Sequence, residues 1–94
     1  MGLTFEWDAK KAAANLRKHG VSFEEASSAF GDPLSLTIPD PEHSTQEQRH
    51  VLLGLTERHR LVVVAHTEQG DTIRIINARP ATPAERREYE EREN

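Results

Sequence analysis

Alternating and helical patterns of apolar residues divide the first third of the chain into short elements. Residues 3–7 alternate between apolar and polar side chains, which predicts a short strand. Asp8 then caps a predicted helix that ends at Gly20. A second predicted helix begins with a capping box at Ser22 and ends at Gly31. The first helix carries its predicted apolar stripe at Ala9, Ala12, Ala13 and Leu16.

The remaining pattern is dominated by strands. Apolar and β-branched residues predict strands at 34–38, 49–55, 60–67 and 72–78. The last three are joined by connections short enough for hairpins, so we expect them to be antiparallel neighbours. Thr82-Pro83 then begins a C-terminal helix, again through a capping box, whose only sizeable apolar side chain is Tyr89. The predicted fold class is α+β: one domain over residues 1–94, with a mostly antiparallel sheet, helices packed on one face and a C-terminal helix.

Length and composition exclude several classes of protein. A chain of 94 residues without cysteine has no disulfide, thiolate nucleophile or cysteine-based zinc site. Its longest apolar run, residues 61–65, is far shorter than the ~20 residues that span a bilayer, and the N-terminus lacks the pattern of a signal peptide. We therefore expect a cytoplasmic protein without membrane association. The glycines are not clustered into a phosphate-binding loop, so we expect no nucleotide cofactor.

The charge is negative overall but unevenly distributed. Twelve Lys and Arg stand against sixteen Asp and Glu, a net charge of −4 that excludes a uniformly basic nucleic-acid binder. The basic residues of the predicted sheet region are all arginines, among them Arg49, Arg74 and Arg79. An arginine flanked by apolar strand residues must face water, an anion or a carboxylate. These three either converge into a platform for phosphate groups or simply pair with surface acids.

Histidines offer proton-transfer chemistry. RNA cleavage without a metal needs one group to take the 2′-OH proton, another to protonate the leaving 5′-oxygen, and cations to stabilise the phosphate. His19 follows Lys18 at a helix C-terminus, where it either complements the helix dipole or serves as an acid or base. The pairs His43/His50 and His59/His66 are each seven residues apart, which is not a metal-binding pattern, so we expect no metal.

Several of these segments together resemble one family. Residues 5–8 (FEWD), 18–26 (KHGVSFEEA) and 73–79 (IRIINAR), followed by Glu85-Arg86 and Tyr89, are similar to the sequences of BrnT-type toxins. The resemblance implies a RelE-like fold and a metal-independent endoribonuclease that inhibits translation. It also implies neutralisation by a BrnA-type antitoxin, with DNA bound only indirectly through that antitoxin.

The resemblance also assigns roles to residues. It implies that Arg49, Arg74 and Arg79 bind phosphate and stabilise its charge. Lys18 and His19 become the acid and base candidates, and His43 and Tyr89 become further substrate-binding candidates. Asn77 departs from the pattern, because the family commonly has serine there.

A second hypothesis is a catalytically inactive module that uses the arginine-bearing sheet to bind a partner protein. It predicts a tight complex without RNA cleavage. A small DNA-binding protein is disfavoured, because the sequence lacks both net positive charge and a helix-turn-helix pattern.

Overall fold

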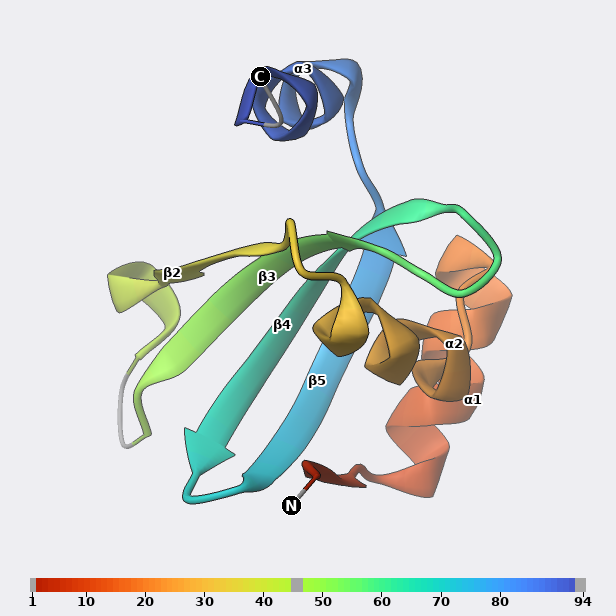
Figure 1. The fold of residues 1–94 in the computed structure, drawn as a ribbon. Coiled ribbons are helices and arrows are strands. Elements are labelled where there is room, and N and C mark those ends of the chain that lie inside the picture. The colour runs from red at the N-terminus through yellow and green to blue at the C-terminus, as the bar shows by residue number, and fades with distance from the viewer. Residues whose placement is uncertain (1, 45–46, 93–94) are drawn as a thin grey trace.

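The structure, a computed structural model, describes residues 2–44 and 47–92 and confirms the α+β class. Its strands are β1 (Thr4–Glu6), β2 (Leu36–Pro39), β3 (Arg49–Leu55), β4 (Leu61–Gln69) and β5 (Thr72–Pro80). Its helices are α1 (Ala9–His19), α2 (Phe23–Ser28) and α3 (Pro83–Arg92), with single 3₁₀ turns η1 (Ala29–Gly31) and η2 (Pro41–His43). Figure 1 shows α1 and α2 beside the sheet and α3 beyond the far end of β5.

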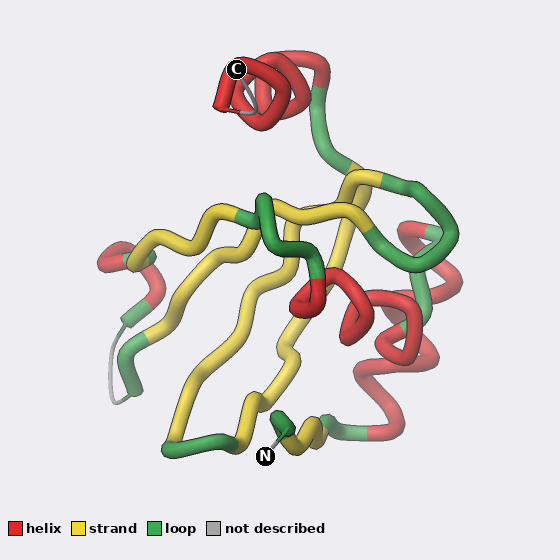
Figure 2. The backbone as a smooth tube through the Cα atoms, viewed as in Figure 1, coloured by secondary structure: helices red, strands yellow, loops and turns green. Residues whose placement is uncertain are grey.

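The five strands form one sheet in the order β1-β5-β4-β3-β2. The three long strands are consecutive antiparallel neighbours, as the short connections predicted, and only β1 runs parallel to its neighbour β5. Figure 2 shows the long central strands flanked by the two short ones. The start of β3 therefore lies beside the end of β4, and the end of β4 lies beside the start of β5.

A bulge in β5 decides which way its side chains point. Ala65 pairs with Asn77, but the next residue of β4, His66, pairs with Ile75, so Ile76 is an extra residue in the ladder. Ala78 consequently joins the buried helix-facing side, although strict alternation from Ile75 would have placed Arg79 there. The bulge thus directs Arg79 to the opposite face of the sheet.

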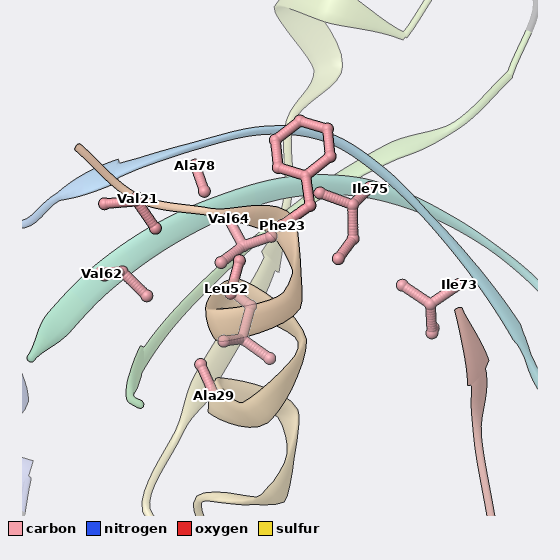
Figure 3. Packing of buried hydrophobic residues seen from close by; sticks show 10 residues of the cluster. Val21, Phe23, Ala29, Leu52, Val62, Val64, Ile73, Ile75 and Ala78 are labelled. Carbon is pink, nitrogen blue, oxygen red and sulfur yellow. The ribbon is translucent and has the colours of Figure 1, made fainter. Parts of the chain in front are cut away.

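The main core lies between the sheet and the first two helices. It is formed by Val21, Phe23, Ala26, Ala29, Leu52, Val62, Val64, Ile73, Ile75 and Ala78. Figure 3 shows the Phe23 ring among the strand residues, close to Ile75. A smaller cluster on the other side consists of Leu53, Leu61, Val63 and Tyr89, and it docks α3.

Of the predicted apolar stripe of α1, only Ala12 packs against the core. Leu16 is 51% exposed, and Ala9 and Ala13 are also exposed. The buried residue of this helix is Asn15, because its amide hydrogen-bonds the backbone at Val21 and Ala78. Polar anchoring, rather than an alanine and leucine stripe, fixes the helix to the sheet.

The two predicted capping boxes have different outcomes. In α3 the box is reciprocal: the Thr82 hydroxyl accepts from the Glu85 backbone N–H (3.2 Å), and the Glu85 carboxylate accepts from the Thr82 N–H (2.8 Å). In α2 the Ser22 hydroxyl caps the Glu25 N–H at 3.0 Å. The Glu25 carboxylate, however, turns away to bind the Thr56 hydroxyl and the Arg60 guanidinium, so only half of the box forms.

Among the described residues, no helix has the length and apolar character needed to cross a membrane.

Candidate active site

A depression of about 440 Å³ lies between α1 and β5 and is here called the α1 depression. Its lining comprises Lys11, Ala14, Asn15, Lys18, His19, Ile76, Asn77 and Arg79. Helical spacing places Lys11 and Lys18 two turns apart on the same side of α1. The predicted acid and base candidates, Lys18 and His19, therefore share a depression with one of the predicted arginines.

Asn15 holds the two walls of this depression together. Its Nδ2 donates to the carbonyl oxygens of Val21 (2.9 Å) and Ala78 (2.8 Å), and its Oδ1 accepts from the Ala78 N–H (3.1 Å). These bonds join α1 to β5 directly behind Asn77 and Arg79. Because Lys18 and His19 lie on the next turn of α1, their position relative to β5 depends on this anchor.

A second depression, of about 220 Å³, lies on the open face of the sheet and is here called the sheet depression. Its lining comprises Asp40, His43, Arg49, Val51, Val63, Ala65, Asn77 and Arg79. Asn77 and Arg79 line both depressions. Asn77 and Arg79 therefore form the divide between the two depressions. The far side of the α1 depression is formed by α1, and the far side of the sheet depression is formed by η2 and β3.

Arg79 is oriented by a bidentate ion pair. Its two terminal nitrogens bind the two carboxylate oxygens of Glu85 at 2.8 and 2.9 Å, and one of them also donates to the Pro80 carbonyl. The Arg79 guanidinium lowers the pKa of Glu85 from 4.5 to about 2. A guanidinium has five N–H donors, so this pairing fixes its direction and leaves donors for another ligand.

Arg49 occupies the opposite wall of the sheet depression. Its backbone N–H donates to the Ser44 hydroxyl, and its carbonyl accepts from Asp40. No carboxylate within residues 2–44 and 47–92 pairs with its guanidinium. Arg49 is thus the better placed of the two depression-lining arginines to bind an added anion.

His43 has the geometry of an oriented proton-transfer group. Its Nδ1 lies 2.8 Å from a carboxylate oxygen of Asp40, and its side chain is 62% exposed. A carboxylate at Nδ1 leaves Nε2 directed away from the pair, as in catalytic carboxylate–histidine arrangements. His19, in contrast, stands at the C-terminal end of α1 beside Gly20, whose φ of 71° ends the helix.

Two predicted site residues lie elsewhere. Arg74 lies level with Thr67 and Arg49 on the same face of the sheet, but it lines neither depression, so these two depressions contain two of the three predicted arginines. The Lys11 backbone N–H lowers the pKa of the Asp8 carboxyl, and the charge of Arg74 adds a smaller effect in the same direction. Tyr89 is 6% exposed, and its hydroxyl donates to Asp32 at 2.6 Å, which makes it the docking residue of α3.

The site is locally positive on a chain that is acidic overall. The two depressions gather Lys11, Lys18, Arg49 and Arg79 against the carboxylates of Asp40 and Glu85. Most other acids lie on the helices and turns. This separation leaves a locally basic surface on a chain with a net charge of −4.

Comparison with known families gives a direct match. The family model described as "Ribonuclease toxin, BrnT, of type II toxin-antitoxin system" matches residues 7–85, which is most of the chain. The chain belongs to the BrnT family of ribonuclease toxins. No curated protein sequence matches it.

A solved BrnT structure has the same fold. The 1.1 Å crystal structure of the ribonuclease toxin BrnT from Brucella abortus superposes with a TM-score of 0.66 at 19% sequence identity. The match covers 85% of this chain and 97% of the Brucella chain. Family membership implies an RNA substrate and an antitoxin partner.

Sequence reasoning missed the roles of two residues in this BrnT chain. Asn77 lies in one of the segments that carry the family resemblance and Asn15 lies between two of them, but nothing in their spacing indicated that Asn15 anchors α1 or that Asn77 separates the two depressions. The signal available was a lone Asn within an alanine-rich helix, which is an unfavourable helix residue unless its side chain has a partner.

Proposed function

We propose that this BrnT protein is a metal-independent endoribonuclease that cleaves RNA, inhibits translation in the cytoplasm and is neutralised by a BrnA-type antitoxin. DNA binding would be indirect, through that antitoxin. One observation carries the proposal: two depressions with basic side chains and histidines meet at Asn77 and Arg79. A phosphodiester lying across this divide would have cations and a proton-transfer group on each side.

The proposed reaction is an internal transesterification. A base takes the proton of the ribose 2′-OH, the 2′-oxygen bonds to phosphorus, and the bond to the 5′-oxygen breaks as an acid protonates that oxygen. His43, oriented by Asp40, and His19 supply the two proton-transfer groups from opposite sides. Arg49, Arg79 and Lys18 stabilise the phosphate charge that increases in the transition state.

The first test is RNA cleavage by the purified chain in EDTA. We expect wild-type activity to persist and Arg49→Ala to lose roughly 100-fold or more, because removal of one charge-stabilising donor has effects of that size. Arg58→Ala is the matched control, since it removes the same charge from an exposed turn. Equal activity of Arg49→Ala and wild type would overturn the proposed site, and loss of all activity in EDTA would overturn metal independence.

The two histidines are tested by the pH dependence of cleavage. His43→Asn and His19→Asn should each remove one limb of a bell-shaped profile. His59→Asn is the control, because His59 lies in an exposed turn with φ of 62°, a conformation that asparagine tolerates. A full profile in both single variants would assign the acid and base to other groups.

Toxicity and neutralisation are tested in cells. Induction of the chain alone should stop growth and reduce incorporation of labelled amino acids, and co-expression of a BrnA-type antitoxin should restore both. Arg49→Ala should be harmless when induced at the same level. Normal growth with the wild-type chain at verified high expression would contradict the toxin assignment.

One observation favours the alternative of an inactive binding module. Arg79 already has a carboxylate partner in Glu85, as expected of an arginine whose role is to fix α3. Under that alternative, the purified chain cleaves no RNA at any concentration. The Arg49→Ala substitution would then weaken a protein complex instead.

A further inference from the structure

A second histidine cluster lies on the other face of the sheet. The register of β3 and β4 places His50 directly opposite His66, and their rings stack with centroids 5.9 Å apart. Glu68, two residues further along β4, approaches His66 Nε2 at 2.9 Å. One potential ligand atom from each of these three residues lies within 4.8 Å of the other two.

We propose that His50, His66 and Glu68 form a binding site for a divalent transition metal of the Zn²⁺ class. Two imidazoles and one carboxylate are a donor set that Zn²⁺ accepts, with a fourth position left for water. The spacing of histidines along the sequence gave no hint of this site, because its pairing is across strands.

The hydrogen bonds of His66 are those of a metal ligand. Its Nδ1 lies 3.2 Å from the Val64 carbonyl oxygen, which can only accept a hydrogen bond. A proton on Nδ1 leaves the lone pair of Nε2 facing the carboxylate of Glu68, and two lone pairs at 2.9 Å need either a proton or a metal cation between them. Metal-ligating histidines characteristically donate their other N–H to a backbone carbonyl in this way.

His50 supplies an independent observation. Its Nδ1 is buried and has no hydrogen-bond partner among the described residues. A buried polar nitrogen without a partner is costly and calls for an unseen ion or water. A modest rotation of the His50 ring would let it coordinate a metal ion. The same ion would then be bound by His50, His66 and Glu68.

The required movements are small, and the site is accessible. Tetrahedral zinc with bonds of about 2.0–2.1 Å holds its ligand atoms about 3.4 Å apart. The widest present spacing therefore has to contract by at most about 1.4 Å, and the 2.9 Å contact between His66 and Glu68 has to lengthen by about 0.5 Å. His66 is fully buried and packs against the Phe30 ring (4.8 Å), whereas Glu68 is 41% exposed and opens the site to solvent.

The site is separate from the proposed RNA site. His50 and His66 face the side covered by Phe30, whereas their neighbours Arg49 and Ala65 line the sheet depression on the opposite face. A metal here would link β3 to β4 and stabilise the fold without touching the phosphate. A metal site here is compatible with RNA cleavage in EDTA, because the metal takes no part in that reaction. The inference of this site does not depend on the proposed function.

The test is titration of the full, chelator-treated chain with Zn²⁺ by calorimetry. We expect one Zn²⁺ per chain and a rise in Tm of about 10 °C at a hundredfold excess of free metal over Kd. Glu68→Gln should weaken binding at least tenfold, and so should His50→Gln. The matched controls are Glu57→Gln and His59→Asn, which remove the same functional groups from an exposed turn and should bind as wild type.

The substitutions also separate this inference from the nuclease proposal. Glu68 is half-exposed, so Glu68→Gln is expected to fold even if the variant at His50 does not. It should lose the Zn²⁺-dependent rise in Tm while cleaving RNA in EDTA as the wild type does. Absence of Zn²⁺ binding by the wild type would overturn the inference and indicate a proton between His66 and Glu68. Unchanged affinity in Glu68→Gln would overturn it as well.

Discussion

The side-chain amide of Asn15 pairs with both backbone polar groups of Ala78, donating to its carbonyl at 2.8 Å and accepting from its N–H at 3.1 Å. This is the kind of bond pair that a neighbouring strand would make. Through it α1 is held against a bulged part of β5, where Ile76 interrupts the regular ladder. The relative position of Lys18 and Arg79 follows from that contact.

Asn15→Leu should therefore reduce both stability and activity. The substitution leaves the Ala78 N–H and carbonyl without a partner in a buried place, which costs about 2–4 kcal/mol in the free energy of unfolding. Displacement of α1 should also reduce RNA cleavage by more than the loss of folded protein explains. Urea unfolding and a cleavage assay on the folded fraction measure the two effects.

Leu16→Ala is the control for the same helix. Leu16 is 51% exposed, so its truncation should change the free energy of unfolding by less than about 0.5 kcal/mol. A larger loss in Leu16→Ala than in Asn15→Leu would mean that the apolar stripe, not the amide, anchors α1.

This helix shows where sequence reasoning reaches its limit. Periodicity identified α1 and its ends correctly, because the Asp8 cap and the left-handed Gly20 are local features. The predicted buried face was wrong for Ala9, Ala13 and Leu16 and right only for Ala12, because alanines at helical spacing are equally compatible with exposure. Only the path of β5, more than sixty residues away, determines that Asn15 has backbone partners.

The site shows the same limit. The family resemblance implied that Arg49, Arg79, His19 and His43 belong to one site, and these four residues line two adjoining depressions. It could not separate Arg74 from them. The bulge turns Arg79 to the sheet face that Arg74 occupies, but Arg74 lies five residues earlier in β5 and outside both depressions. The His50–His66 pair was missed for a similar reason: it depends on the register of two strands.

The Arg79–Glu85 pair predicts a specific dependence of stability on pH. The pKa of Glu85 is about 2 in the folded chain, below its ordinary 4.5, so its contribution is fully present above about pH 4.5. It is lost as the pH falls towards 2. After allowance for solvent screening of a partly exposed pair, we expect it to be worth about 1–2 kcal/mol.

Glu85→Gln tests this contribution. The variant should be less stable than wild type at pH 7 by about 1–2 kcal/mol, and the difference should shrink between pH 5 and pH 2. Urea midpoints across that range give the comparison. Glu88→Gln removes an exposed carboxylate one turn away in the same helix. Its urea midpoints should change with pH in the same way as those of the wild type. A Glu85→Gln difference that stays constant with pH would refute the ion-pair account.

Tyr89→Phe separates docking from substrate binding. The hydroxyl donates to Asp32, whose carboxylate also accepts from the Leu55 N–H at 2.9 Å, so its removal should cost about 1–2 kcal/mol of stability. Cleavage per folded molecule should be unchanged, because the ring lies within the α3 cluster and lines neither depression. A tenfold loss of activity at full folding would instead place the hydroxyl in the substrate site.

Gly54 predicts a steric requirement at the far end of β3 from Arg49. A Cβ there would lie 3.0 Å from the Ala29 carbonyl oxygen, 3.0 Å from the Leu52 side chain and 3.2 Å from Ser35 Cβ. The backbone of η1 cannot give way without disturbing the core residue Ala29, so Gly54→Ala should destabilise the fold by about 1–3 kcal/mol. Gly31→Ala is the matched control, because its added methyl group meets nothing within 4 Å. Thermal unfolding should show a lowered Tm for Gly54→Ala and an unchanged Tm for Gly31→Ala. Equal Tm values for the two variants would mean that η1 and β3 move apart easily to admit the methyl group. This side of the core would then be less tightly packed than the contacts indicate.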